Sequence, residues 1–421
     1  MKWPVAKIDQ IAATGTGGTP PRKEGIRFFG GTIPWIKSGE LKDAVLNSAV
    51  ETITDAALAE SNAKLVPPGA VLIALYGATV GRTALLGFEA ATNQAVCHII
   101  PDRRLAEPRF VWYGLRAELP ALLRKRVGGA QPNISQHIIR STTLPLPALR
   151  EQQRIVNLLE QADGLRRQRV EADALADRIL PALFHQIFGD PATNPKGWPN
   201  RKLGDVIVET SYGTSNPSNA SGEGLPVLRM NNIESNGRLN LADLKHVTLD
   251  EGEVEKHSLR DGDLLFNRTN SKELVGKTGL WRGGFPAVAA SYLIRVRVDI
   301  SQAVPDYIWA WMNTRYFKQR LFDIARRAVG MANINATELR AMPLLVPVMA
   351  LQHAFAARLR SLDGLAARRE EAAQQLQKLF STLLHRAFAG DLTAKWREAH
   401  LRELAAEMEH QARLLKSPTE E

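Results

Sequence analysis

The sequence predicts an α+β chain in which one mixed α/β domain occurs twice in tandem. Two long antiparallel coiled-coil helices, related by an approximate two-fold axis, are expected to join the copies. The segment from Asn133 to Arg169 aligns without a gap on the segment from Asn333 to Arg369. A helical pattern continues beyond both segments, and a skeleton of matching turns precedes each. A period of about half the chain indicates a tandem duplication rather than a solenoid.

Both long segments carry apolar and small residues at alternating steps of three and four, which is typical of a helix with one packed face. The first series is Ile155, Leu158, Ala162, Leu165, Ala172, Ala176, Ile179 and Leu183, and the second is Phe355, Leu359, Leu362, Ala366, Ala372, Leu376, Leu379 and Leu383. The heptad spacing favours pairing of the two helices, with independent packing on separate domains as the alternative. Gly164 and Gly364 predict close approach or bending, and Pro181, opposite Ser381, predicts a kink.

The globular parts match only in a skeleton of turns, strands and helix starts. The matching pairs are 33–37 with 225–229, 68–72 with 261–265, 80–83 with 275–278 and 108–112 with 305–309. The second pair predicts a turn followed by a strand, and the last predicts a helix that begins with proline. The glycine-rich segment 15–20 is interpreted as a flexible surface turn rather than a phosphate contact.

These patterns divide the chain into six parts. We expect a first globular domain at 1–146, a first long helix at 147–188, a linker at 189–197, a second globular domain at 198–345, a second long helix at 346–389 and a helical tail at 390–421. The linker, FGDPATNPKGWP around its ends, is dense in Pro, Gly and Asn, which break regular structure.

The composition indicates a globular protein with a polyanionic partner. The 54 Lys and Arg residues exceed the 44 acidic residues, which gives a formal net charge of +10. The single cysteine, Cys97, allows no internal disulfide and suits a reducing compartment. The N-terminus has no apolar signal core and the chain has no apolar run near the length of a membrane span. A cytoplasmic protein without a membrane partner is therefore expected.

Catalytic motifs are weak or missing in the sequence. The segment from Ser271 to Thr278 ends in Gly-Lys-Thr, but serine stands where a phosphate-binding loop needs glycine. No His or Cys cluster has the spacing of metal ligands. The chain also lacks the Asn/Asp-Pro-Pro-aromatic tetrapeptide and the glycine-rich turn of a methyltransferase. We expect no catalytic residue, no metal and no cofactor on this chain.

Side chains suited to DNA recur in or near loops of both globular parts. Arg, Lys, Asn and Gln read guanine and adenine edges in the major groove, and other basic residues hold phosphates. The candidates are Lys37, Arg82, Asn93, Gln94, Arg124, Lys125 and Arg126 in the first copy, and Arg229, Asn231, Asn232, Asn267, Arg268, Asn270, Lys272, Lys277, Arg326 and Arg327 in the second. For any single residue a solvated surface role is at least as frequent, so the recurrence carries the prediction.

The duplicated helix with its Asp-Gly-Leu triplet, the linker and the paired endings Phe188-Gly189-Asp190 and Phe388-Ala389-Gly390-Asp391-Leu392 resemble the specificity subunits of type I restriction–modification systems. The resemblance implies that each globular part is a target-recognition domain for one half of a split, asymmetric double-stranded DNA site. It implies that the helices act as a spacer and dock two methyltransferase (modification) subunits, with restriction/translocase subunits added for phage defence. S-adenosylmethionine is then expected on the methyltransferase subunit. Base-contacting residues do not carry over from this family.

Three other functions stay open at this point. A coiled-coil scaffold that binds only protein would show little salt dependence with DNA, whereas phosphate contacts give a steep one. An enzyme with an unrecognised site would be active as a purified chain. A specificity protein that serves a related methylase or a single-sided nuclease would be distinguished by its copurifying subunits.

Overall fold

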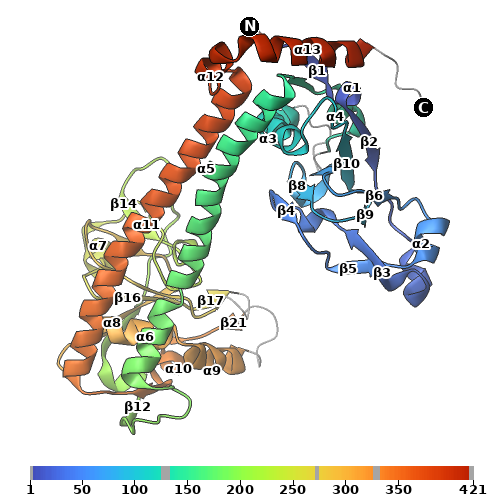
Figure 1. The fold of residues 1–421 in the computed structure, drawn as a ribbon. Helices are drawn as coiled ribbons and strands as arrows, with labels where there is room; N and C mark the ends of the chain where they lie inside the picture. Colours follow the sequence, from blue (N-terminus) through green and yellow to red (C-terminus); the bar gives the residue numbers. More distant parts are fainter. Residues whose placement is uncertain (1–2, 125–132, 271–274, 326–331, 417–421) are drawn as a thin grey trace. The chain divides into compact units, whose positions relative to one another are not determined.

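The computed structural model describes residues 3–124, 133–270, 275–325 and 332–416. The chain forms two compact units (Figure 1). Unit 1 consists of Met1–Arg169 with Ala372–Glu421, and unit 2 consists of Val170–Glu371. Each unit therefore holds one globular α+β domain and a part of each long helix. This confirms the predicted fold class of two α/β domains with two long helices.

Unit 1 contains two mixed sheets and a short ladder. In spatial order the first sheet has β2 (Ala12–Thr16), β10 (Val96–Pro101), β7 (Val71–Ala74), β8 (Thr83–Leu86) and β4 (Ala44–Leu46). The second sheet has β5 (Glu51–Ile53), β3 (Phe29–Ile36), β9 (Ala90–Thr92) and β6 (Leu65–Val66), and β1 (Val5–Lys7) pairs with β11 (Thr143–Pro145). Strands β7, β8 and β9 are buried along their whole length, as apolar runs covered on both faces require.

Unit 2 repeats this topology with other side chains. Its main sheet has β13 (Ile207–Tyr212), β20 (Leu293–Val298), β16 (Leu264–Asn267) and β18 (Thr278–Leu280). The second sheet has β15 (Lys245–Val247), β14 (Leu225–Leu228) and β19 (Val288–Ala289), and the ladders are β12 (Asn200–Lys202) with β22 (Pro343–Leu345) and β17 (Thr269–Asn270) with β21 (Ala332–Asn333). In both units the second sheet contains a parallel pair, β3 with β9 and β14 with β19. This agreement supports the duplication inferred from the sequence.

The helices of the two domains begin where the sequence predicts. Helix α3 (Pro108–Arg124) packs on the main sheet of unit 1, and α8 (Pro305–Met312) takes the same place in unit 2. Unit 2 then breaks the helix and continues as α9 (Arg315–Ala325). The remaining helices are α1 (Ile8–Ile11), α2 (Asp55–Glu60), α4 (Gln136–Ser141), α7 (Glu251–His257) and α10 (Ala336–Arg340), with 3₁₀ turns at Arg22–Arg27, Ser38–Glu40, Gly77–Thr79, Leu203–Val206 and Met230–Asn232.

The glycine-rich segment 15–20 is not the flexible surface turn that the sequence predicted. Gly15 belongs to β2, and a Cβ at Gly17 would lie 2.0 Å from the carbonyl oxygen of Thr92. Gly213 occupies the same place in unit 2, where a Cβ would lie 2.1 Å from the Ala289 carbonyl oxygen. The glycines allow two backbones to approach closely where the sheets meet.

The first long helix is interrupted and the second is continuous. Helix α5 (Leu149–Ala176) ends just before α6 (Ile179–Phe188), whereas α11 runs unbroken over Met349–Ala389. Pro181 explains the break, because it has no N–H to donate to the Asp177 carbonyl and its ring crowds that group. The predicted kink is confirmed. Ser381, its counterpart in α11, donates its hydroxyl to the Gln377 carbonyl without breaking the helix.

Within unit 2 the two long helices pair antiparallel. Arg369 Nε donates to Asp173 Oδ1 at 2.7 Å, and the Phe184 and Phe355 rings lie 5.9 Å apart, so α11 runs backwards as the first helix advances. Within unit 1 the Arg166 guanidinium lies 4.6 Å from the centre of the Phe380 ring. These contacts confirm the predicted antiparallel pair inside each unit.

The predicted apolar seam is only partly buried. In unit 1 Ile155 and Ala162 are buried as predicted, but Leu159 is buried and the predicted Leu158 only half-buried, and Leu165 is exposed although the heptad pattern placed it inside. A Cβ at Gly164 or Gly364 would meet only open space, so the predicted close approach is wrong. Part of the predicted apolar stripe is therefore exposed to solvent.

The linker is a fixed turn that caps α6. Gly189 has a φ of 84°, which only glycine adopts without strain. Lys196 Nζ donates to the Ile187 carbonyl at 2.7 Å, and Trp198 Nε1 donates to the Phe188 carbonyl at 2.8 Å. These donors satisfy carbonyls at the helix end that have no partner within the helix.

The predicted helical tail forms two helices in unit 1. They are α12 (Ala394–Ala399) and α13 (Leu401–Lys416). The buried Glu151 at the start of α5 accepts bonds from Thr393 Oγ1 at 2.6 Å, from Arg397 Nε at 2.8 Å and from Trp3 Nε1 at 2.9 Å. Gln411 of α13 donates to the Leu105 carbonyl at 2.9 Å. The tail is therefore docked on the domain of unit 1.

Candidate nucleic-acid interface

A hollow in unit 1 brings together three of the predicted DNA-binding residues. Strands β3 and β9 are parallel neighbours, so the residues that follow them, Lys37 and Asn93, emerge at the same edge. The Asn93 N–H donates to the Ile36 carbonyl at 2.9 Å, which fixes this geometry. Lys37, Asn93 and Gln94 line a hollow of about 520 Å³ with the turn after β7.

The hollow offers both a charge and free amide groups. Lys37 Nζ forms an ion pair with Glu51, and Arg22 Nη2 lies 3.7 Å from the same carboxylate. Gln94 is exposed, whereas Asn93 Oδ1 is buried without a hydrogen-bond partner among the described residues. Asn and Gln amides pair with the donor and acceptor of an adenine edge. Arg22 was not among the predicted residues, because its neighbours in sequence carry no repeat signal.

The remaining candidates of unit 1 lie on one turn and one helix end. Arg82 is exposed directly after Gly81, where a Cβ would lie 2.7 Å from Leu119 and 3.1 Å from Leu123. The turn therefore packs on the last part of α3, which ends at the exposed Arg124. Lys125 and Arg126 lie outside the described residues.

Three candidates of unit 2 make internal contacts. Arg229 Nη2 donates to the Asp243 carbonyl at 3.0 Å. The buried Asn232 donates to the carbonyls of Asn240 and Asp243, and its Oδ1 accepts from the Arg229 N–H. Lys277 Nζ donates to the carbonyls of Met230 and Ile233, and burial lowers its pKa. These bonds hold the loop after β14 against the turn before β18.

A second lysine supports the same turn. Lys318 of α9 donates to the Gly276 carbonyl. Burial, with repulsion from Lys277, lowers the pKa of Lys318 to about 7. A Cβ at Gly276 would lie 2.3 Å from Leu321, so the turn packs on α9 as its counterpart packs on α3.

A cation–aromatic contact between the half-buried Arg268 and Tyr212, with Tyr292 joined to Arg268 through the backbone, distinguishes unit 2. The Arg268 guanidinium lies 4.6 Å from the centre of the Tyr212 ring, and the Arg268 N–H donates to the Tyr292 carbonyl at 3.1 Å. Tyr292 is 54% exposed and Tyr212 is 41% exposed. The sequence prediction included Arg268 but missed both tyrosines, since isolated aromatic residues on different strands carry no spacing signal.

The other candidates of unit 2 are scattered. Asn231 is exposed beside Arg229, and Asn267 is fully buried at the end of β16. Asn270 ends β17 and pairs with Ala332 of β21. Lys272, Arg326 and Arg327 lie outside the described residues.

Neither a metal site nor a membrane helix is found in the described part of the chain. Among these residues, no group of three or more His, Cys, Asp and Glu side chains is placed to hold a metal ion. None of the helices at residues 3–124, 133–270, 275–325 and 332–416 is long and apolar enough to cross a membrane.

Known proteins resemble this chain over nearly its whole length. The model of the type I restriction modification DNA specificity domain matches residues 1–172. The specificity subunit of the type I restriction enzyme EcoKI from Escherichia coli strain K12 is 23% identical, over 94% of this chain and 90% of that protein. The chain is therefore similar to type I restriction–modification specificity subunits, and its first 172 residues match their DNA specificity domain.

Two solved structures share the fold of this specificity subunit. The type I restriction–modification system S subunit from M. genitalium superposes with a TM-score of 0.55 at 13% identity, over 92% of this chain and 96% of that chain. A chain from a structure that concerns complex assembly and conformational transition of the type I R-M system gives a TM-score of 0.57 at 19% identity, over 93% and 98%.

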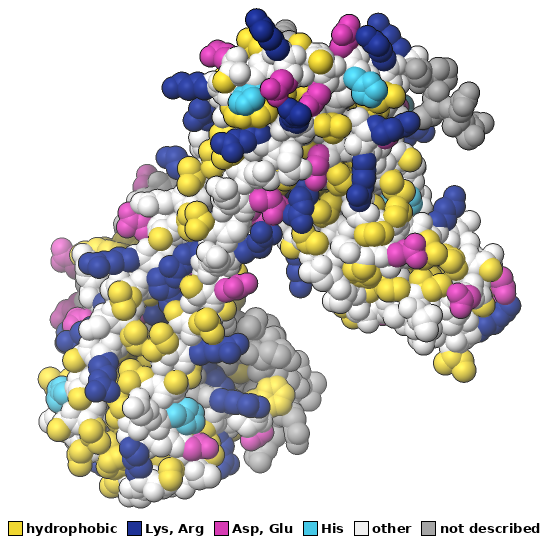
Figure 2. All heavy atoms as spheres, viewed as in Figure 1, with side chains coloured by type: hydrophobic (Ala, Val, Ile, Leu, Met, Phe, Trp, Pro, Cys, Tyr) yellow, Lys and Arg dark blue, Asp and Glu magenta, His cyan; other side chains and the backbone are white. Residues whose placement is uncertain are grey.

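The long helices of the specificity subunit leave apolar side chains in solvent. Leu165 and Leu379 are exposed in unit 1, and Val170, Leu175 and Leu365 are exposed in unit 2. On the face drawn in Figure 2, apolar side chains lie among Lys and Arg side chains where α6 and α11 run.

Proposed function

We propose that each unit of this specificity subunit reads one half of a split DNA site, so that the site is bipartite and asymmetric. The domains at 1–146 and 198–345 are the target-recognition domains in this proposal. The observation that supports it is the repeated strand-end geometry. In each domain the parallel pair of the second sheet ends at one edge, where a basic residue, Lys37 or Arg229, follows the first strand.

The two reading surfaces differ in chemistry. In unit 1 we assign base contacts to Asn93 and Gln94 and phosphate contacts to Arg82 and Arg124. In unit 2 we assign base and phosphate contacts to Arg268 with Tyr212 and Tyr292, and to the exposed Asn231 on the loop after β14. Arg229, Asn232 and Lys277 take a supporting role, because their polar atoms already bond to loop carbonyls or hold the loop in place. Different side chains at equivalent edges would give different half-sites.

The long helices at 147–188 and 346–389 set the number of unread base pairs between the half-sites and dock two methyltransferase subunits. Their exposed apolar residues support the docking role. The methyltransferase subunits bind S-adenosylmethionine, restriction/translocase subunits complete the complex, and the assembly works in the cytoplasm. Adding the same few residues to both helices should change the spacing, and an unchanged spacing would contradict the ruler role.

The test is sequencing of host DNA with detection of modified bases, with and without the gene for this chain. A split motif with a fixed gap, lost on deletion, is the expected result. If every modified motif remains after the gene is deleted, the proposal is contradicted. DNA affinity of the purified complex should also fall steeply with salt, since phosphate contacts release counterions. A flat salt dependence would favour a scaffold that binds only protein.

A further inference from the structure

Unit 2 contains an apolar pocket of about 440 Å³ beside the break between α5 and α6. Its walls come mainly from helices and include Leu180 and Phe184 of α6, Trp309 and Ala310 of α8, and Leu362 of α11. This volume lies in the range of pockets that bury a ligand or a large side chain. Its lining also includes Asn236 and Arg238 of the loop after β14.

The corresponding place in unit 1 is filled by larger side chains. The repeat aligns Trp112 with Trp309, so Tyr113 corresponds to Ala310 and Arg116 corresponds to Asn313. The Tyr113 and Phe380 rings lie 6.2 Å apart, and the Arg116 guanidinium lies 5.0 Å from the centre of the Phe380 ring. Phe380 corresponds to Leu180. The loss of a phenol, a phenyl ring and a guanidinium opens the pocket in unit 2.

The mouth of the pocket carries positive charge. Arg238, Arg315 and Arg369 are among its lining residues, against the single carboxylate of Asp177. Arg369 pairs with Asp173 and Arg238 with Asp363. Arg315 is exposed and forms no ion pair with the described residues. A carboxylate on the occupant would therefore find an uncompensated cation at the rim.

The apolar lining continues out of the pocket onto the helix surface. Ile179 is 47% exposed and Leu365 is 54% exposed, and both line the pocket. A small molecule inside the pocket would leave these side chains in water. A protein that inserts one side chain and lies along the helices would cover them, which favours a macromolecular occupant.

We propose that this pocket receives one large apolar side chain, aromatic or leucine-like, from a protein partner with a carboxylate next to that side chain. The inference rests on the proposed function in one respect, because it takes the partner to be the methyltransferase subunit. It follows that the two methyltransferase docking places are unequal. Unit 2 offers an anchor pocket, and the corresponding place in unit 1 is occupied by the subunit's own Tyr113, Arg116 and Phe380.

The experiment titrates the full-length subunit with the methyltransferase subunit of the same organism and counts complexes with one and two methyltransferase copies by mass photometry. The first variant is Ala310→Tyr, which fills the pocket with the residue found in unit 1. We expect one of the two binding steps to weaken by roughly 30-fold, as for an interface hot spot, and the other to stay unchanged. The matched control is Ala182→Tyr, the same change at an exposed position of α6 outside the pocket.

A second variant tests the anchor without changing the packed interior of the pocket. Arg315→Glu changes an exposed rim residue and should weaken the same step, by less than Ala310→Tyr does. Melting temperatures of all variants are compared with that of the wild type. Unchanged affinities in Arg315→Glu and in a folded Ala310→Tyr would overturn the anchor. A second result would also overturn it: octanoate raises the melting temperature of the wild type but not of Ala310→Tyr, while methyltransferase binding is the same in both. That result would assign the pocket to a small apolar anion.

The two proposals fail in different ways. A wild-type subunit that binds no methyltransferase contradicts the proposed docking role of the helices. A wild-type subunit that binds two copies, with Ala310→Tyr binding both equally well, contradicts only the pocket.

Discussion

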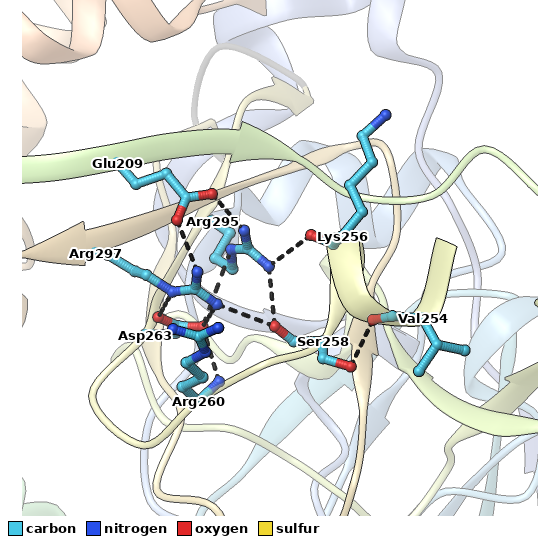
Figure 3. A network of polar contacts seen from close by, with 8 residues as sticks. All are labelled: Glu209, Val254, Lys256, Ser258, Arg260, Asp263, Arg295 and Arg297. Atoms are coloured by element: carbon cyan, nitrogen blue, oxygen red, sulfur yellow. Dashed lines mark hydrogen bonds and ion pairs between the residues drawn. The ribbon is translucent and has the colours of Figure 1, made fainter. Parts of the chain in front are cut away.

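Where strand β10 of unit 1 carries His98 and Ile100, strand β20 of unit 2 carries Arg295 and Arg297. In unit 1 the His98 ring is accommodated by Gly15 of β2, where a Cβ would lie 2.4 Å from Nε2. In unit 2 both arginines are bound by carboxylates. Arg295 Nη2 donates to Glu209 at 2.6 Å, and Arg297 Nε donates to Asp263 at 3.0 Å (Figure 3).

The network of unit 2 also binds a helix end. Arg295 Nη1 donates to the Lys256 carbonyl at 3.0 Å and to the Ser258 carbonyl at 2.9 Å, where α7 ends (Figure 3). Apolar and small residues therefore build this sheet in unit 1, and a buried ionic network builds it in unit 2. The backbone topology therefore does not depend on the polar network. We expect single substitutions in this sheet to reduce stability more in unit 2 than in unit 1, because a broken network leaves a buried charge.

Asp263→Ala should have the largest effect. The Asp263 side chain is 3% exposed and neutralises Arg297, so its loss leaves that guanidinium buried with Glu209 alone. We expect a loss of about 3–5 kcal/mol in the stability of unit 2. Hydrogen exchange of strands β16 and β20, followed by mass spectrometry, measures it separately from unit 1. Glu209→Ala is the control with a smaller effect, since its carboxylate is 42% exposed. Equal losses in both units would contradict the comparison.

Lys318 should give unit 2 a pH dependence of its own. Its folded pKa of about 7 lies below the ordinary value of 10.5, so the unfolded chain binds more protons between these values. The stability of unit 2 should therefore rise with pH across this window, by up to about 1.4 kcal/mol per pH unit. Hydrogen exchange of α9 at pH 7 and pH 9, corrected for the intrinsic rate, measures the change. Lys318→Met should remove the dependence, and a slope that survives in this variant would contradict the assignment.

A smaller effect distinguishes the glutamines that start the two long helices. Gln352 Nε2 donates to the Pro347 carbonyl at 2.8 Å, and its Oε1 accepts from the Val304 N–H at 2.9 Å. Gln352→Ala should cost unit 2 about 1–3 kcal/mol, because it leaves buried backbone groups without partners.

Gln152→Ala should cost unit 1 less. Gln152 also donates to the Leu105 carbonyl at 2.9 Å, but Gln411 of the tail donates to the same oxygen and remains after the change. The two variants are compared by measuring the stability of each unit in denaturant, followed by hydrogen exchange. Removing both Gln152 and Gln411 should exceed the sum of the single changes. An additive double variant would show that the tail does not share this role.

Much of the fold could be predicted from the sequence, because the repeat appears in local patterns. The heptad spacing predicts a long helix at 346–389, where α11 runs over Met349–Ala389, and proline at Pro108 and Pro305 marks two helix starts. The side of the helices that stays in solvent could not be predicted. Leu165 fits the apolar stripe but is exposed, because the burial of a position depends on its tertiary neighbours, which the spacing does not encode.

The candidate site was less predictable. Whether a basic side chain is free to contact DNA or is bonded within the protein depends on residues far away in the sequence. Lys277 bonds to the carbonyls of Met230 and Ile233, which no spacing rule connects to it. Arg229 and Asn232 are likewise bound to the loop that contains Asp243. Composition alone cannot separate such loop-bracing residues from free ones such as Gln94. The cluster of Tyr212, Arg268 and Tyr292 forms only when separate strands come together.

The most direct test of the central claim changes one unit at a time and sequences modified host DNA. The variants are Asn93→Ala with Gln94→Ala in unit 1, and Arg268→Ala in unit 2. We expect each variant to relax or change one half of the split motif and to leave the other half and the gap intact. The halves affected should differ between the two variants. Changes in both halves from either variant, or the same half from both, would contradict a division of DNA reading between the two units.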